Sequence, residues 1–337
     1  MAGLSDFDYA LPEERIAQAP PEQRDAARML VVDRASGAWQ DRLFRNLPEF
    51  VGPGDCVVLN NSRVIPSRLF GKTVSGARVQ FLLLKAIGPL RWTALGRPGR
   101  RLLPRDVVTF DAGVSAEIIE TLERGERVLQ FRGVSDNAAL GRFLDEHGHV
   151  PLPPYIHRPD DSADRARYQT VFARPEGSVA APTAGLHFTS AMLERIQERG
   201  AEIAEVTLHV GLGTFQPIER EDFENHQLHT EHFEIGPDAW SQIERAGRVL
   251  AVGTTAVRTI ESAARQNTLS GETQLFLYPG ASFLRTGAML TNFHLPKSSL
   301  LLLVCAFGGT DLILRAYRHA VEARYRFFSY GDCMLIL

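Results

Sequence analysis

The stretch Val249-Leu250-Ala251-Val252-Gly253-Thr254-Thr255 joins a short apolar strand directly to the start of a helix. The positive end of such a helix can hold an anion such as a carboxylate. An earlier segment has the same arrangement of elements, because Thr189 caps a predicted helix, Gly200 ends it, and a strand follows over residues 203–210. Helices and strands that alternate in this way predict an α/β domain.

Residues 67–134 depart from this pattern and consist of short apolar segments separated by Gly and Pro turns. They predict a small all-β barrel inserted into the α/β domain, which would then comprise residues 1–66 and 135–337. A helix over 136–146 and a stiff Pro-rich segment at 151–154 would return the chain to the larger domain. A length of 337 residues is sufficient for two hydrophobic cores. The predicted barrel strands include 79–84, 107–110, 116–119 and 127–131.

Charge is distributed unevenly along the chain. The net charge is -3, yet the segment from Arg63 to Arg105 contains ten Lys and Arg residues and no Asp or Glu. A basic module on an otherwise acidic protein is typical of polyanion binding, because each contact between a basic side chain and a phosphate releases counterions. The alternative is a basic face exposed to solvent without a partner. The candidate contacts to nucleic acid are Arg91, Arg97, Arg100, Arg101 and Arg105.

Several classes of protein are disfavoured by composition. Residues 1–9 contain two Asp and lack the basic and apolar regions of a secretory signal. The longest apolar run, 300–307, is far shorter than the roughly 20 residues of a membrane-spanning helix. Cys56, Cys305 and Cys333 are odd in number and lie in apolar surroundings, which favours reduced thiols. We therefore expect a cytoplasmic protein that does not enter a membrane.

Two segments with small residues provide the first candidate site residues. In 207–215, strand alternation places His209 on the face opposite its apolar neighbours, and Gly211, Gly213 and Thr214 would allow close approach of a ligand. A bent strand without a ligand is the alternative. In 177–189, a run of small residues leaves room for an extended substrate beside His187, with Thr183 and Gly185 in the same run. A single histidine of this kind is also common in a purely structural role.

The cluster His226, His229, Glu231 and His232 raises the possibility of a metal site, but its spacing does not suit one. On a strand, His229 and Glu231 share one face while the other two histidines share the opposite face. On a helix, spacings of three and six do not converge as a pair four residues apart would. We expect no metal here and interpret His229 and Glu231 as a hydrogen-bonded pair suited to proton transfer or to orienting a substrate hydroxyl.

The remaining candidates follow strand ends or lie in aromatic-rich segments near the end of the chain. Residues 60–63 directly follow a compact apolar strand at 55–59. In the late segments aromatic rings could stack on a nucleic-acid base or adenine, although the same residues are common in protein cores. These candidates are Asn60, Asn61, Arg63, Thr254, Thr255, Arg258, Tyr278, Asn292, His294, Lys297, Tyr330 and Asp332.

Taken together, seven strings in order resemble the S-adenosylmethionine:tRNA ribosyltransferase-isomerase family over essentially the whole chain, although 67–134 matches in organisation more than in sequence. The resemblance implies an α/β larger domain, with a mixed sheet or a barrel and helices, plus an inserted small all-β barrel. The strand order of the larger domain cannot be deduced from periodicity. The strings lie at 5–9, 59–66, 181–189, 209–215, 253–261, 292–299 and 328–332.

The resemblance also implies a reaction. Members of this family transfer the ribosyl group of S-adenosylmethionine to 7-aminomethyl-7-deazaguanine at the wobble position of tRNA, which yields epoxyqueuosine, adenine and methionine. S-adenosylmethionine is consumed as a co-substrate, and no true cofactor is implied. The reaction needs a base for the carbon beside the sulfonium, an acid for departing adenine and polar contacts to ribose. Candidate bases are His187, His209, His229 and Glu231.

Roles for the binding residues are expectations of the same kind. Arg258 and Lys297 would contact the methionine carboxylate or a tRNA phosphate. Residues 60, 61 and 63 would contact the deazaguanine or ribose. We expect a monomer. Three other functions remain as alternatives: an RNA-binding module without catalysis, a metal-dependent hydrolase built on 226–232, and a methyltransferase, which would usually carry a Gly-rich turn after its first strand.

Overall fold

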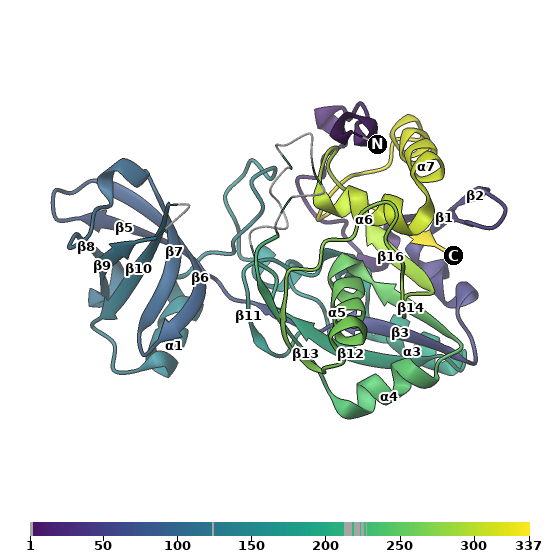
Figure 1. Ribbon diagram of the computed structural model, residues 1–337. Coiled ribbons are helices and arrows are strands. Elements are labelled where there is room, and N and C mark those ends of the chain that lie inside the picture. Colours follow the sequence, from purple (N-terminus) through teal and green to yellow (C-terminus); the bar gives the residue numbers. More distant parts are fainter. Residues whose placement is uncertain (1–2, 123–124, 212–217, 219–222, 224–225, 227) are drawn as a thin grey trace.

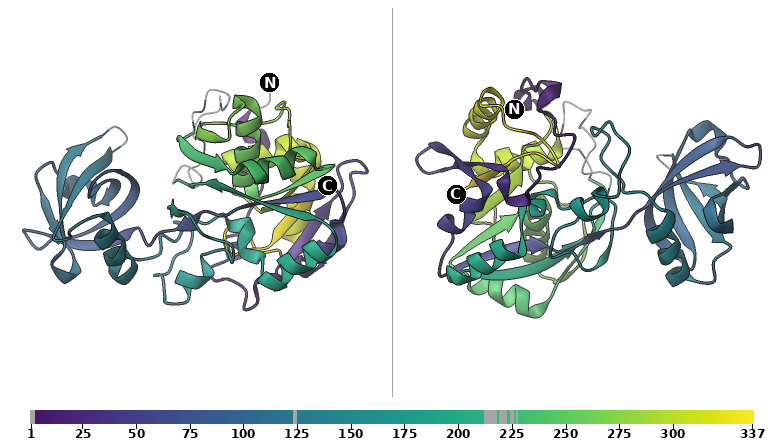
Figure 2. Two further views of the ribbon diagram at one scale, coloured as in Figure 1. Left: turned by 90° about the horizontal axis from the view of Figure 1, so that it is seen from below. Right: turned by 180° about the vertical axis from the view of Figure 1, so that it is seen from behind.

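Two domains of unequal size make up the molecule (Figure 1). The computed structural model describes all residues except 1–2, 123–124, 212–217, 219–222, 224–225 and 227. An all-antiparallel barrel lies to one side of a larger domain built on a mixed sheet. Figure 2 shows the barrel set apart from the larger domain, with the chain crossing between them twice. The predicted fold class is confirmed, and the larger domain has the open mixed sheet rather than a second barrel.

The sheet of the larger domain has the strand order β15-β13-β12-β3-β14-β16-β17-β1-β2 within the described residues. Strands β12, β3, β14 and β16 are parallel neighbours, and β1 is parallel to β17, whereas the other pairs are antiparallel. The strands are β1 (Arg28–Val32), β2 (Trp39–Leu43), β3 (Asp55–Asn60), β12 (Glu202–Leu208), β13 (Glu231–Ile235), β14 (Arg248–Val252), β15 (Ser270–Thr273), β16 (Ala288–Asn292) and β17 (Cys333–Ile336).

Helices and 3-10 segments cover both faces of this sheet, which explains why β3 and β14 each contain a run of four buried apolar residues. Successive residues of β3 point to opposite faces, so Val58 joins one hydrophobic cluster while Val57 and Leu59 join the other. The first cluster includes buried residues of α4 (Pro237–Arg245), α5 (Gly253–Gln266), α6 (Ser299–Gly308) and α7 (Thr310–Glu322). The second includes residues of α3 (Ser190–Glu198) and of the 3-10 helices Phe44–Phe50 and Thr183–His187.

Local signals in the sequence fix the ends of these helices. Thr189 caps α3 because its hydroxyl accepts the N–H of Met192, as the sequence predicts. Ser298 caps α6 in the same way by accepting the N–H of Leu301. Gly253, at a φ of +87°, allows β14 to turn sharply into α5. Among the described residues, no single helix is long and apolar enough to span a membrane; α6 and α7 pass that test only as a pair bent by 116°.

The inserted domain is a closed barrel in the order β10-β7-β6-β5-β8-β9. Helix α1 (Asn137–His147) lies beyond the predicted boundary at residue 134, yet its Leu140, Phe143 and Leu144 belong to the barrel core. Its apolar face therefore places it with the barrel, and the larger domain resumes only after this helix. The barrel strands are β5 (Arg68–Thr73), β6 (Arg78–Gly88), β7 (Arg91–Arg97), β8 (Val107–Thr109), β9 (Ser115–Thr121) and β10 (Glu126–Arg132).

Candidate functional site

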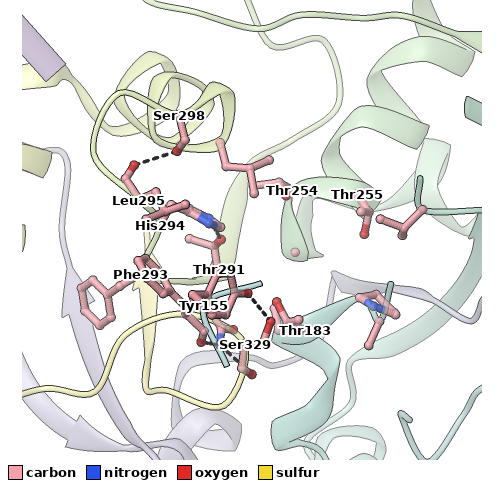
Figure 3. Close-up of a pocket in the computed structure, with 18 residues that line it drawn as sticks. Tyr155, Thr183, Thr254, Thr255, Thr291, Phe293, His294, Leu295, Ser298 and Ser329 are labelled. Atoms are coloured by element: carbon pink, nitrogen blue, oxygen red, sulfur yellow. Dashed lines mark hydrogen bonds between the residues drawn. The ribbon is translucent and has the colours of Figure 1, made fainter. Parts of the chain in front are cut away.

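The four parallel strands β12, β3, β14 and β16 bring their carboxyl ends to one edge of the sheet. Asn60 is the last residue of β3, and the segments that follow the other three strands contain Gly211, Thr254 and His294. In open α/β sheets, ligands bind in the crevice outside this edge. An open cavity lies at this edge, and its lining includes residues at the end of β16 and residues that follow β14 and β16. We call it the main cleft (Figure 3).

The starts of two helices border the main cleft. Gly253, Thr254 and Thr255 begin α5, and Ser298 and Leu300 belong to the start of α6. Thr254 and Ser298 both line the cavity and are labelled in Figure 3. Each helix start presents backbone N–H groups and the positive end of a helix dipole. The hydroxyl of Thr255 is buried and has no hydrogen-bond partner among the described residues. This wall is therefore suited to a ligand that carries an anion or hydroxyl groups.

His294 lines the main cleft as a neutral imidazole. Burial lowers its pKa from 6.5 to about 3. Its Nε2 lies 2.8 Å from the Thr291 hydroxyl, its backbone N–H donates to the Tyr317 hydroxyl, and its carbonyl accepts the Tyr9 hydroxyl. These bonds fix the ring at the end of β16, where it can hydrogen-bond a ligand without carrying charge.

His187 supports the main cleft from outside. Its Nε2 lies 3.3 Å from Oδ1 of Asn292, which lines the cleft and donates its amide to the carbonyl of Phe328. Burial lowers the pKa of His187 to about 4, and the bond to Asn292 offsets only part of that shift. His187 borders a separate small cavity, so it is placed to orient Asn292.

A second part of the cleft contains a buried ion pair. Arg258 of α5 pairs with Glu231 at the start of β13, and both side chains are at most 7% exposed. His229 and the apolar side chain of Leu300 line the same space, and Leu300 also lines the main cleft. The two cavities are therefore neighbours, and we call the smaller one the arginine subsite. The structure brings together three of the sequence candidates here: His229, Glu231 and Arg258.

Both groups of the ion pair have further contacts. One oxygen of Glu231 accepts the N–H of Gly211 at 2.8 Å, and Nε of Arg258 donates to the carbonyl of Leu275. Nη2 of Arg258 is buried and has no partner among the described residues. A buried guanidinium with an unused N–H group favours an acceptor from outside the chain.

His209 does not line the main cleft or the arginine subsite. It lies beside Gly177, where an added Cβ would come within 2.9 Å of the imidazole ring. Burial and then His232 lower its pKa, and its Nδ1 has no hydrogen-bond partner among the residues that the structure describes. Its predicted face is correct, but that face points away from the cleft.

Two other candidates at a strand end, Asn60 and Asn61, form hydrogen bonds within the protein. The amide of Asn60 binds both backbone groups of Leu208, so it joins β3 to β12. Asn61 donates to Glu205 and accepts the hydroxyl of Thr207. A side-chain amide has both a donor and an acceptor, and these contacts leave the two asparagines little capacity for a ligand.

Several remaining candidates have structural contacts away from the cleft. Arg63 is exposed and lies 3.6 Å from Glu176. An added Cβ at Gly185 would meet Phe172 and Thr170 at 2.8 Å, so this glycine serves packing. Tyr278 packs on Phe223 and Phe276, Lys297 pairs with Asp8 at 2.8 Å, Tyr330 donates to Asp164, and Asp332 accepts the N–H groups of Arg28 and Arg326.

Thr183, Thr254, Thr255, Asn292 and His294 line the main cleft. Gly213 and Thr214 lie outside the described residues. On the barrel, Arg97, Arg100 and Arg105 are exposed, and the side chain of Arg101 is not among those described. Arg91 is also exposed, and its Nε donates to Gln130.

Several cleft residues were missed by the sequence analysis, among them Tyr155, Ser298 and Ser329. Tyr155 follows the predicted Pro-rich segment, and its hydroxyl lies 2.6 Å from that of Ser329. Burial raises the pKa of Tyr155. Ser298 could have been found, because a Ser two residues before the apolar run 300–307 is a helix-cap signal. Nothing local in the sequence marks Tyr155 and Ser329 as neighbours, since 174 residues separate them.

Comparison with known proteins agrees with this architecture. Residues 4–336 match the family described as queuosine biosynthesis protein. The S-adenosylmethionine:tRNA ribosyltransferase-isomerase of Solibacter usitatus is 58% identical over 99% of both chains, and that of Symbiobacterium thermophilum is 49% identical over 99% of both. A crystal structure of an S-adenosylmethionine tRNA ribosyltransferase from Thermotoga maritima is 37% identical, with a TM-score of 0.57 over 98% of this chain and 100% of that chain. The chain belongs to the queuosine biosynthesis protein family.

Proposed function

We propose that this protein transfers the ribosyl group of S-adenosylmethionine to a modified guanine of tRNA and isomerises it during queuosine biosynthesis. The observation that carries the proposal is the main cleft with its adjoining arginine subsite, at the carboxyl edge of the parallel strands. Together they offer an apolar and aromatic cavity, two helix starts and a buried arginine. Family membership supports the same reaction.

S-adenosylmethionine has chemically distinct ends, and each matches one part of the site. The adenosine would occupy the main cleft, beside Tyr155 and Phe328 and within reach of the polar groups of Thr255 and Asn292. The methionine carboxylate would accept the unused Nη2–H of Arg258 in the arginine subsite. The sulfonium and the ribose would then lie near Leu300, which borders both spaces.

His229 is the base that this placement favours. A sulfonium acidifies the neighbouring carbon, so a histidine can remove the proton. Glu231 is occupied by Arg258 and by the N–H of Gly211, and His187 and His209 lie outside both cavities. The carbanion formed beside the sulfonium would open the sugar, and adenine would leave with a proton supplied by a general acid. The expelled ring oxygen and the loss of adenine would leave an aldehyde and a vinyl sulfonium. The acceptor amine would add to the vinyl sulfonium and lose a proton, and the ylide formed would close on the aldehyde. The resulting alkoxide would displace methionine from the neighbouring carbon and close the epoxide.

The acceptor in this proposal is 7-aminomethyl-7-deazaguanine at the wobble position of tRNA, and the product is epoxyqueuosine. Exposed Arg97 and Arg105 on the barrel support binding of the tRNA backbone. We further propose that the protein acts in the cytoplasm as a monomer, without a cofactor and without a metal ion. S-adenosylmethionine is consumed as a substrate.

The test is to incubate the purified protein, without added metal, with S-adenosylmethionine and tRNA carrying 7-aminomethyl-7-deazaguanine. Equal amounts of adenine, methionine and epoxyqueuosine are expected. S-adenosylhomocysteine as the product would mean methyl transfer and overturn the proposal. Binding of tRNA without any product would instead favour an RNA-binding module. Activity that a chelator abolishes and zinc restores would overturn the metal-free part.

A further inference from the structure

A third, small cavity lies beside the main cleft and has no role in the proposed reaction. It is lined by Arg24, Arg167 and His187, together with Ser329, which also lines the main cleft. His187 and Ser329 therefore form a wall between the two spaces, and His187 contacts Asn292 on the cleft side. We call this cavity the phosphate pocket.

The two arginines of the phosphate pocket are held in place by backbone carbonyls rather than carboxylates. Arg24 donates to the carbonyls of Leu186 and Ala166 at 3.0 and 2.7 Å. Arg167 donates to the carbonyls of Glu22 and Pro21. In the part of the chain that the structure describes, neither guanidinium has a carboxylate partner.

Positive charge accumulates at this place without neutralisation. Burial and then the charge of Arg167 lower the pKa of Arg24. The Nε of Arg167 is buried and has no hydrogen-bond partner among the described residues. The carboxylate of Asp164, three residues before Arg167, is already bound by Arg158 and Tyr330. Two guanidinium groups placed together in this way repel each other, and an anion between them would remove that repulsion.

We propose that the phosphate pocket binds one phosphate group of the tRNA backbone. Arginine is the preferred side chain for phosphate, because its planar N–H groups match the phosphate oxygens. Both guanidiniums are already oriented by backbone carbonyls, so binding loses little side-chain entropy. A phosphate held here is one residue layer from the main cleft and fixes the position of the neighbouring nucleotides. The proposal rests on the proposed function for the identity of the RNA.

The experiment measures the Kd of the modified tRNA at several KCl concentrations for the full-length protein. The variant Arg24→Gln/Arg167→Gln removes both charges, whereas Arg24→Lys/Arg167→Lys retains them but loses the planar N–H groups. Arg318→Gln removes an exposed arginine of α7 and serves as the control. Inorganic phosphate is titrated separately to distinguish a site for free phosphate from a site for the RNA backbone.

In the Gln variant, we expect the Kd to rise by about tenfold and the salt dependence of log K to become less steep by about 0.7 to 0.9, the contribution of one phosphate. The Lys variant should keep most of the salt dependence, because it retains both positive charges. If the arginines had only a structural role, the Lys and Gln variants would not differ in this way. KM for tRNA should rise in the Gln variant while KM for S-adenosylmethionine is unchanged.

A Gln variant with the salt dependence and KM of the Arg318→Gln control would overturn the proposal. Tight binding of inorganic phosphate that leaves the affinity for tRNA unchanged would assign the pocket to a free anion instead and equally overturn it. A thermal melt of each variant identifies loss of folding, and the Lys variant then decides the question. If the unaltered protein forms no product, the proposed function fails, whereas the salt dependence still reports on the pocket.

Discussion

Arg258 and Glu231 form an ion pair in which both side chains are at least nine-tenths buried. Buried charges that lack a partner are strongly unfavourable, so each group of the pair stabilises the other in the protein interior. The pair does not use every donor of Arg258, because Nη2 of this side chain has no hydrogen-bond partner among the described residues. The protein therefore maintains a desolvated positive charge directly beside the main cleft.

The first prediction separates the two ends of S-adenosylmethionine. Arg258→Gln should raise the Kd for S-adenosylmethionine by about 10- to 100-fold, because the variant cannot form the charge-assisted hydrogen bond to the carboxylate. The same variant should bind methylthioadenosine, which lacks the amino acid portion, as tightly as the unaltered protein does. Isothermal titration calorimetry of both ligands with both proteins measures how much of the affinity for S-adenosylmethionine depends on contact between Arg258 and its amino acid portion.

Equal weakening of the two ligands would show that Arg258 acts only through folding of the site. Glu231→Gln is the matched comparison, since it leaves Arg258 charged and unpaired. It should lower the free energy of unfolding by about 3 kcal/mol.

The second prediction concerns proton removal by His229. His229→Gln should reduce kcat by about 100-fold or more, the usual contribution of a general base, with little change in the Kd for S-adenosylmethionine. Exchange of the hydrogens beside the sulfonium with solvent deuterium should slow in parallel. A variant that retains full turnover would remove His229 from the reaction, and His209→Gln is the control because His209 lies outside both cavities.

Local sequence patterns predicted the α/β units and part of the lining of the main cleft. Strand alternation, Gly253 and the Thr189 cap predicted the α/β units, because these signals act between residues close in the chain. The same local reasoning predicted Thr254, Thr255 and Asn292, which all line the main cleft.

The partner of a polar side chain is set by strands that are distant in sequence, and it could not be predicted. Asn60 was expected to contact a ligand, yet its amide satisfies Leu208, 148 residues away. Arg258 and Glu231 were predicted separately, but their pairing depends on how α5 lies against the start of β13. The core role of α1 likewise depends on which domain covers its apolar face.

The third prediction uses the lowered pKa of His187. The pKa of His187 is about 4 in the folded protein, compared with 6.5 for a histidine in an unfolded chain. Below pH 6.5 the unfolded chain therefore binds a proton more readily than the folded protein does. The stability that the neutral ring contributes is thus complete above pH 6.5 and is lost as the pH falls toward 4. The difference in the free energy of unfolding between the unaltered protein and His187→Gln should decrease by about 2 kcal/mol from pH 7 to pH 5, because the unaltered protein loses stability. Urea unfolding at the two pH values measures this difference. A constant difference would contradict the neutral buried ring.

The fourth prediction concerns Glu261 of α5, which is fully buried. Burial alone would raise its pKa, but the N–H groups of residues 284–286 and the Arg265 guanidinium outweigh burial and lower it. The stability from this carboxylate is present above about pH 4.5 and is lost as the pH falls through the lowered folded pKa. Glu261→Gln should cost about 2 to 4 kcal/mol at pH 7, because an amide cannot accept all of these bonds. The cost should decrease below about pH 4, which urea unfolding measures.

The fifth prediction tests the barrel as a surface for tRNA. Arg97 and Arg105 are exposed, whereas Arg132 is paired with Glu117 and its charge is already neutralised. Arg97→Gln/Arg105→Gln should weaken tRNA binding regardless of sequence and make the salt dependence of log K less steep by about 0.7 to 0.9 for each phosphate that the barrel no longer binds. Arg132→Gln should leave both quantities nearly unchanged. If Arg132→Gln weakens tRNA binding as much as Arg97→Gln/Arg105→Gln does, the barrel contributes only its net charge and no specific phosphate contacts. If neither variant changes tRNA affinity, the RNA binds to the larger domain alone.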